Sequence, residues 1–175
     1  MPGTSRYERL LQLRDDLRVH VRPIRADDEP GLHEAFARMS ERSVYLRFFS
    51  PLKRLPEELA RRLARVDHRN RFALVATTDR PDGREHILGV ARYDRVPDTE
   101  VAEVAIAVVD EMQRRGLGSA LLGLLAQVAR EHGIQTFVLI VLPDNQGLLR
   151  LLRKLGWIHH ARLQGGVYEI TFDLP

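Results

Sequence analysis

The chain has 175 residues, of which 44% are hydrophobic and 29% are charged, and its formal net charge is +3. These values are typical of one folded globular domain and exclude wholesale disorder, while the small basic excess gives only weak support to nucleic-acid binding. The chain has no cysteine, which excludes disulfides and thiolate metal sites. We expect a cytoplasmic protein without a membrane partner, because we find no apolar run of the length of a membrane span or a secretory signal.

The first third of the chain predicts a strand followed by helices. Residues 1–17 are polar with scattered leucines and predict a helical or irregular lead-in, outside the domain. The alternation of apolar and polar residues over 18–24 predicts a half-buried strand. Pro30 and Pro56 each stand in the first turn of an expected helix. Between them, "YLRFF" (45–49) is expected to pack in the core, with lining of an acceptor site as the alternative.

The rest of the chain predicts most of the sheet. The expected elements are strands over 71–78, 87–96, 101–109 and 136–142, helices over 117–132 and up to Gly156, and a final hairpin. This order predicts an α/β fold with one domain, residues 18–175, in which helices flank a mixed and largely antiparallel sheet of about six to seven strands. A doubly wound dinucleotide fold fits poorly, because a uniform βαβ alternation is absent.

The sequence "QRRGLG", residues 113–118, lies between an expected buried strand and an expected helix. The free N–H groups and the dipole of a helix N-terminus favour an anion, and glycine lets a ligand approach the backbone closely. A P-loop would need lysine where Leu124 stands, and a dinucleotide fingerprint would need glycine where Leu121 stands. A phosphate-binding turn of another kind remains, with a plain strand-to-helix turn as the structural alternative.

The segment "IAVVDEMQRRGLGSALL" resembles the acetyl-CoA-binding motif of the GNAT superfamily of acyl-CoA-dependent N-acyltransferases, a strand followed by Q/R-x-x-G-x-G/A and a helix. The segment from Asn145 to Gly156 and Trp157 resembles the second motif of this family. The predicted order of elements over about 18–173 also agrees with that fold. In addition, "YLRFF" and "AEVAIAV" are similar to the acetyltransferase domains of bacterial protein-lysine acetyltransferases.

The resemblance implies how acetyl-CoA would bind. The main chain of residues 106–108 would pair with the pantetheine arm, the amides of residues 114–119 would hold the pyrophosphate, and Asn145 would hydrogen-bond the pantetheine. Arg114 and Arg115 would add positive charge, unless they are solvated surface groups. The expected binding residues are Ile106, Ala107, Val108, Gln113, Arg114, Arg115, Gly116, Leu117, Gly118, Ser119 and Asn145. We expect no metal.

Glu103 is the expected general base. A lysine amine of ordinary pKa, about 10.4, is protonated at neutral pH and must lose its proton before it attacks a thioester. Glu103 interrupts an apolar strand, so we expect it to be buried, where an unpaired carboxylate holds a proton more readily. Lysine-acetylating members of the family carry a glutamate at the matching place. The alternative is a strand-edge glutamate that is solvated or paired with an arginine such as Arg92.

The chain departs from the family pattern at Leu152, where many members carry a tyrosine that protonates the departing CoA thiolate. The expected function is direct transfer of an acetyl group to an amine, because the absence of cysteine disfavours a thiol acyl-enzyme. The expected acceptor is a protein lysine, with a small-molecule amine or a protein N-terminus as the alternative. A noncatalytic acyl-CoA-binding sensor domain also stays open. We expect no nucleic-acid partner, and a homodimer stays open.

Overall fold

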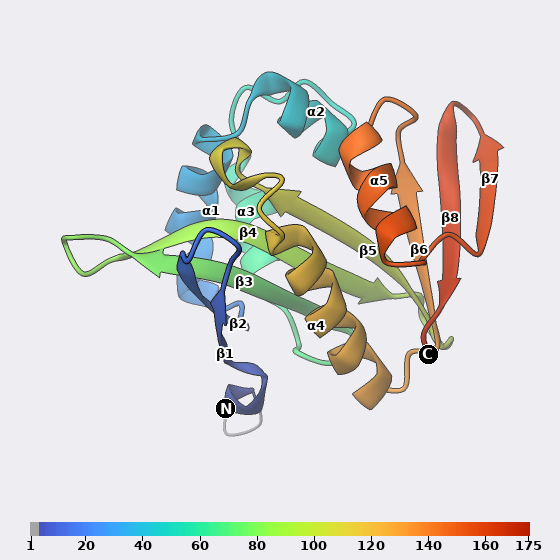
Figure 1. Cartoon of the computed structure of the whole chain (residues 1–175), viewed down its shortest axis with the longest axis horizontal. Helices are drawn as coiled ribbons and strands as arrows, with labels where there is room; N and C mark the ends of the chain where they lie inside the picture. Colours follow the sequence, from blue (N-terminus) through green and yellow to red (C-terminus); the bar gives the residue numbers. More distant parts are fainter. Residues whose placement is uncertain (1–3) are drawn as a thin grey trace.

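In the computed structural model, which describes residues 4–175, a mixed sheet of eight strands runs through the described part of the chain (Figure 1). The strands are β1 (Arg9–Gln12), β2 (Arg18–Pro23), β3 (Arg71–Asp79), β4 (Glu85–Arg95), β5 (Val101–Val108), β6 (Thr136–Val141), β7 (His160–Gln164) and β8 (Val167–Asp173). Their spatial order is β1-β2-β3-β4-β5-β6-β8-β7. The β5–β6 pair is parallel, and the other pairs are antiparallel.

Five α-helices flank this sheet within residues 4–175: α1 (Glu29–Ala37), α2 (Glu41–Phe48), α3 (Glu57–Ala64), α4 (Leu117–Glu131) and α5 (Gln146–Lys154). Helix α4 lies across one face of the sheet, and α1 and α3 cover the other (Figure 1). Short 3₁₀ turns occur at Ser5–Tyr7, Ala26–Asp28 and Asp110–Met112. Of the helices described, none combines the length and the apolar character needed to cross a membrane.

The apolar residues of α4 fix this helix against the centre of the sheet. Leu117, Leu121 and Leu125 are at most 1% exposed. A Cβ atom added at Gly89 of β4 would lie 3.2 Å from Leu121 Cδ1, so a glycine there allows the close approach of helix and strand. This packing places the N-terminus of α4 beside the carboxyl end of β5, because Gly89 pairs with Val108.

The structure confirms the predicted α/β fold with a mixed, largely antiparallel sheet, and it adds β1 to the expected strands. The prediction of a helical or irregular lead-in was wrong for residues 9–12, which pair with β2 in a hairpin. Since most of β1 is exposed, its sequence lacks the alternation that marks a half-buried strand. Tyr7 and Leu13, in the same lead-in, are buried in the core. Residues 1–3 lie outside the described part.

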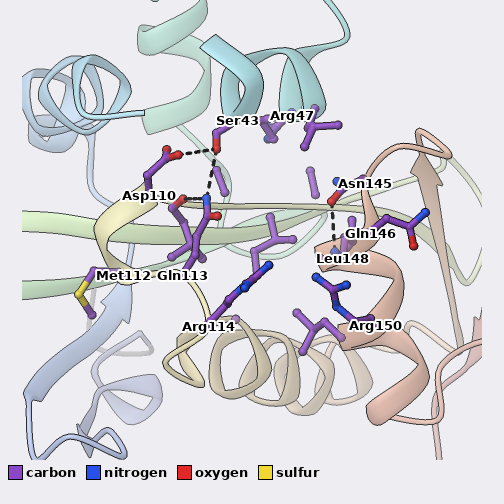
Figure 2. Close-up of a pocket in the computed structure, with 18 of the residues that line it drawn as sticks. Ser43, Arg47, Asp110, Met112, Gln113, Arg114, Asn145, Gln146, Leu148 and Arg150 are labelled. Atoms are coloured by element: carbon purple, nitrogen blue, oxygen red, sulfur yellow. Dashed lines mark hydrogen bonds between the residues drawn. The ribbon is translucent and has the colours of Figure 1, made fainter. Parts of the chain in front are cut away.

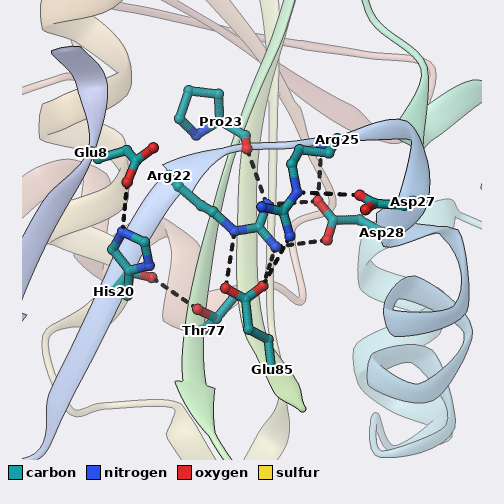
Figure 3. A network of polar contacts seen from close by, with 9 residues as sticks. All are labelled: Glu8, His20, Arg22, Pro23, Arg25, Asp27, Asp28, Thr77 and Glu85. Atoms are coloured by element: carbon teal, nitrogen blue, oxygen red, sulfur yellow. Dashed lines mark hydrogen bonds and ion pairs between the residues drawn. The ribbon is translucent and has the colours of Figure 1, made fainter. Parts of the chain in front are cut away.

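A buried ion-pair network ties β2 to the start of α1 and to β4 (Figure 3). Arg22 is 3% exposed, and its Nη1 and Nη2 donate to the two carboxylate oxygens of Asp28 at 2.8 and 2.7 Å. Arg22 also forms an ion pair with Glu85, and the Arg25 N–H donates to Asp28 Oδ2 at 2.7 Å. Burial alone would raise the pKa of Asp28, but the bonds from Arg22 and Arg25 outweigh it and lower this pKa.

Candidate functional site

Strands β5 and β6 pair at one end and separate toward the other. Their parallel pairing covers Val101–Glu103 on β5 and Thr136–Val138 on β6, and β6 then continues along β8. The second half of β5 borders a cleft of about 790 Å³, which residues of α2, α5 and the N-terminus of α4 also line (Figure 2). The cleft therefore has a strand edge on one side that can accept an extended ligand.

The N-terminus of α4 opens into this cleft without a side-chain cap. Gly116 precedes the helix with φ 90° and ψ 0°, and Arg114 is also in the left-handed region with φ 62°. The amides of residues 117–119 have no carbonyl partner in the first turn, and the helix dipole favours negative charge there. A Cβ atom added at Gly118 would lie 3.0 Å from Leu151 Cδ2, so the glycine lets α4 approach α5. The loop is suited to binding an anion.

Polar contacts hold the loop before α4 in place (Figure 2). Gln113 Nε2 donates to the Val108 carbonyl at 3.0 Å and to Ser43 Oγ at 3.2 Å. Asp110 accepts from the Ser40 N–H at 2.8 Å and from Ser43 Oγ at 3.2 Å. Burial alone would raise the pKa of Asp110, but these bonds outweigh it and lower this pKa. Asp110 is therefore ionised at neutral pH and acts in positioning the loop.

Asn145 lines the cleft and also begins α5. Its Oδ1 accepts from the Leu148 N–H at 3.1 Å and so caps the helix. The cap leaves the two N–H donors of the side-chain amide, for which the described residues supply no acceptor. Asn145 can therefore donate to a ligand in the cleft while it caps α5.

The cleft is rich in positive charge. Its lining includes six basic side chains and two carboxylates, namely Arg14, Arg42, Arg47, Arg114, Arg150 and Lys154, with Asp110 and Asp144. Of these cations, Arg114 was predicted as a binding residue and Arg47 stood only in the alternative for "YLRFF", while the other four were not predicted. Arg150 and Lys154 are four residues apart on an amphipathic helix, a spacing that predicts that both lie on one face of it. This spacing does not predict that the face lies beside the glycine loop. This charge suits a ligand that carries several phosphates.

Most of the predicted binding residues come together at the cleft. Those that line it are Ile106, Ala107, Val108, Gln113, Arg114, Gly116, Gly118, Ser119 and Asn145. Arg115 does not line it, because its guanidinium forms an ion pair with Asp15 and donates to Met112 Sδ at 3.1 Å. Leu117 is 1% exposed and its side chain packs in the core, so only its main chain is available to a ligand.

Glu103 is exposed, and the prediction that it is buried was wrong. It lies opposite the exposed Asp94 on β4, one pair before the end of the ladder, and two residues before Ala105, which lines the cleft. Since side chains alternate along a strand, Glu103 and Ala105 point to the same face of the sheet. Arg92 pairs in register with Ala105, and no ion pair joins Arg92 to Glu103 in the described part of the chain.

Two further predictions concern α2 and α5. The prediction of core packing was wrong for Tyr45 and Phe49, which are 44% and 42% exposed. Leu46, Arg47 and Phe49 line the cleft. Helix α5 buries Leu152 fully. The residue that stands where many family members carry tyrosine thus belongs to the core.

Comparison with known proteins shows the family of the chain. Residues 35–157 match the model of the "Acetyltransferase (GNAT) family". An acetyltransferase of Pseudomonas aeruginosa is 27% identical over 146 residues, which cover 83% of this chain and 78% of that protein. The acetyltransferase Pat of Mycolicibacterium smegmatis is 30% identical over 168 residues, which cover 94% of this chain and 48% of Pat.

Two solved structures are also similar. The crystal structure of the GNAT domain of S. lividans PAT superposes with a TM-score of 0.89 and 34% identity, and the match covers 97% of this chain and 98% of that domain. A cAMP-binding acyltransferase from Mycobacterium smegmatis superposes with a TM-score of 0.67 and 25% identity, over 98% of this chain and 49% of that one. The chain spans about half the length of these mycobacterial proteins. The chain belongs to the GNAT family of acetyltransferases.

Proposed function

We propose that the chain transfers an acetyl group from acetyl-CoA to a primary amine, which is the side chain of a protein lysine. The observation that carries this proposal is the free half of β5 leading to the uncapped N-terminus of α4 inside a cation-rich cleft. An extended arm with a pyrophosphate at one end matches both features. The choice of a lysine rests on the likeness of "YLRFF" and "AEVAIAV" to the acetyltransferase domains of bacterial protein-lysine acetyltransferases.

Different residues of the cleft would bind different parts of acetyl-CoA. The amides of residues 116–119 would hold the pyrophosphate, with Arg114 as an added charge, and the main chain of residues 106–108 would pair with the pantetheine. Asn145 would donate to the pantetheine through its free amide hydrogens. Because the glycine loop lies at the carboxyl end of β5, this direction leads the thioester toward Ala105 and Glu103.

Glu103 would act as the general base for the amine. It would take the proton of the ammonium group, after which the amine nitrogen forms a bond to the thioester carbonyl carbon. The bond from carbon to sulfur then breaks, and the thiolate leaves with its electron pair. Leu152 is buried and cannot donate a proton to this thiolate. The attacking nitrogen loses its second proton as the amide forms, and water would carry this proton to the thiolate. The exposure of Glu103 gives the amine access from solvent.

One observation favours a second candidate function. Glu103 is not among the residues that line the cleft, so the cleft could bind an acyl-CoA without turnover. In that case the chain would be an acyl-CoA sensor. The two functions differ in whether the protein with bound acetyl-CoA acetylates any amine in a panel of proteins and small molecules. Acceptors with free N-termini belong in that panel, because they are the enzymatic alternative to lysine.

Replacing Gly116 tests the phosphate site. A residue with a side chain at φ 90° is strained, so Gly116→Ala should lower the free energy of unfolding by about 1 kcal/mol. It should also raise the Kd for acetyl-CoA about tenfold, because displaced amides lose charge-assisted hydrogen bonds. Isothermal titration calorimetry measures the Kd.

Gly123→Ala, on the same helix, is the matched control. An added Cβ atom at Gly123 has nothing within 4 Å and no unfavourable φ. This variant should raise the free energy of unfolding by about 0.5–1 kcal/mol and leave the Kd unchanged. Equal affinity of Gly116→Ala and Gly123→Ala for acetyl-CoA would argue against a pyrophosphate at this loop.

A further inference from the structure

A second cavity lies under α1–α3, on the other face of β5. It has a volume of about 60 Å³. Met39, Arg47, Ala105 and Ala107 line both this cavity and the cleft, so the two spaces adjoin at β5. The remaining walls are mostly apolar and include Leu32, Ala35, Phe36, Phe48, Leu55 and Leu63. A space of this size takes a short chain of a few atoms.

Two arginines in this cavity have no carboxylate partner in the described part of the chain. Arg92 is 6% exposed, and its Nη2 donates a hydrogen bond to the Leu63 carbonyl at 2.7 Å. The guanidinium of Arg47 lies 4.7 Å from the centre of the Phe48 ring. Burial, and next the charge of Arg47, lower the pKa of Arg92 to about 9, so Arg92 remains a cation at neutral pH. Burial also lowers the pKa of Arg47.

The surroundings do not neutralise this pair. Asp94 is the carboxylate whose charge acts on both arginines, but its side chain is 51% exposed and accepts from Arg71 Nε at 3.4 Å. Arg62 and Arg71 add further positive charge near Arg92. A buried cation is costly without an anion, and the positive charge of the half-buried Arg47 adds to the cost at Arg92. The cavity thus has the charge of an anion-binding site.

The register places this charge next to the reacting end of the cleft. Arg92 lies directly opposite Ala105 on β5, and Ala105 and Ala107 line both the cleft and the cavity. In the proposed function, the thioester lies near Ala105 and the amine arrives on the exposed side, at Glu103. Because Ala105 lines both the cleft and the second cavity, the acyl chain of a thioester near Ala105 lies beside the second cavity.

We propose that Arg47 and Arg92 bind the terminal carboxylate of a short acyl group, so that the chain accepts a dicarboxylic monothioester of CoA, such as succinyl-CoA, in addition to acetyl-CoA. This inference rests on the proposed binding of acyl-CoA in the cleft. The apolar walls would contact the methylene groups, and the two guanidinium groups would supply charged hydrogen bonds to the carboxylate.

The test compares the Kd of succinyl-CoA with that of butyryl-CoA, which has an acyl chain of the same carbon number without the carboxylate. Wild-type protein should bind succinyl-CoA about tenfold or more tightly than butyryl-CoA. Arg92→Met should bring this ratio close to one and keep the Kd for acetyl-CoA, and Arg47→Met should also bring the ratio close to one. Arg61→Met, an exposed cation on α3, is the matched control and should keep the ratio of the wild type.

The inference would be overturned if the wild type bound succinyl-CoA and butyryl-CoA with similar Kd values. It would also be overturned if Arg92→Met kept the wild-type ratio of these two Kd values. An increase in the KM for the amine acceptor with an unchanged ratio would also overturn it, because the arginines would then bind the acceptor. Arg92→Lys keeps the charge and should retain part of the preference, which guards against a simple loss of folding in Arg92→Met. If the wild type binds no acetyl-CoA at all, the proposed function fails instead.

Discussion

Glu103→Gln is expected to lower kcat for acetylation of a lysine substrate by about 10²- to 10⁴-fold at neutral pH, the contribution of a positioned general base. The Kd for acetyl-CoA should stay the same, because Glu103 does not line the cleft. Glutamine keeps the size of the side chain but cannot accept the proton of the ammonium group. Steady-state kinetics, with the affinity measured separately, checks both statements.

Asp94→Asn is the matched control for this variant. Asp94 lies directly opposite Glu103 in the ladder, is exposed like Glu103 and carries the same charge. If Glu103 acts as the base and not only through its charge, Asp94→Asn should lose far less activity than Glu103→Gln. Wild-type turnover by Glu103→Gln would rule out the assigned base. Binding of acetyl-CoA by a wild type that acetylates no tested amine would favour the sensor function.

Arg22→Met should lower the free energy of unfolding by about 3–5 kcal/mol, the cost of removing one partner of a buried ion pair. The substitution leaves Asp28, whose side chain is 8% exposed, without the two bonds from the guanidinium. It also breaks the pair with Glu85 and so loosens the contact between β2, α1 and β4. Denaturation in urea, followed by circular dichroism, measures the change.

Arg25→Met is the control in the same network (Figure 3). The Arg25 side chain is 55% exposed and pairs with Asp27 and Glu85, while its contact with Asp28 runs through the main-chain N–H. Exposed ion pairs contribute about 0–1 kcal/mol, so this variant should remain close to the wild type. A similar loss in the two variants would show that burial of Arg22 does not set the stability of this region.

The fold was predictable for elements whose own residues show the periodicity of a buried strand or helix. The apolar runs of β5 and β6 and the stripe on α4 gave these elements to within one or two residues, since burial dictates their periodicity. Strand β1 was not predictable, because the pairing of its main chain with β2 holds it and its exposed side chains carry no such pattern.

The candidate site was predictable where a sequence motif marks it. The glycine loop was found by its spacing, while residues 106–108 and Asn145 followed from the family resemblance, and these residues line the cleft. Arg47 and Arg150 come from α2 and α5, and only the folded chain brings them to the same cleft. The exposure of Glu103 depends on the register with Asp94, which the residues of one strand do not reveal.

The proposed function requires that the cleft between β5 and β6 binds acetyl-CoA along β5 and at the N-terminus of α4. Hydrogen exchange of the wild-type chain, followed by NMR with and without saturating acetyl-CoA, tests it most directly. We expect slower exchange at the amides of residues 106–108 and 116–119 and little change in β2 and β3, which do not line the cleft. Unchanged exchange at these residues in the presence of bound acetyl-CoA, with protection elsewhere, would contradict it.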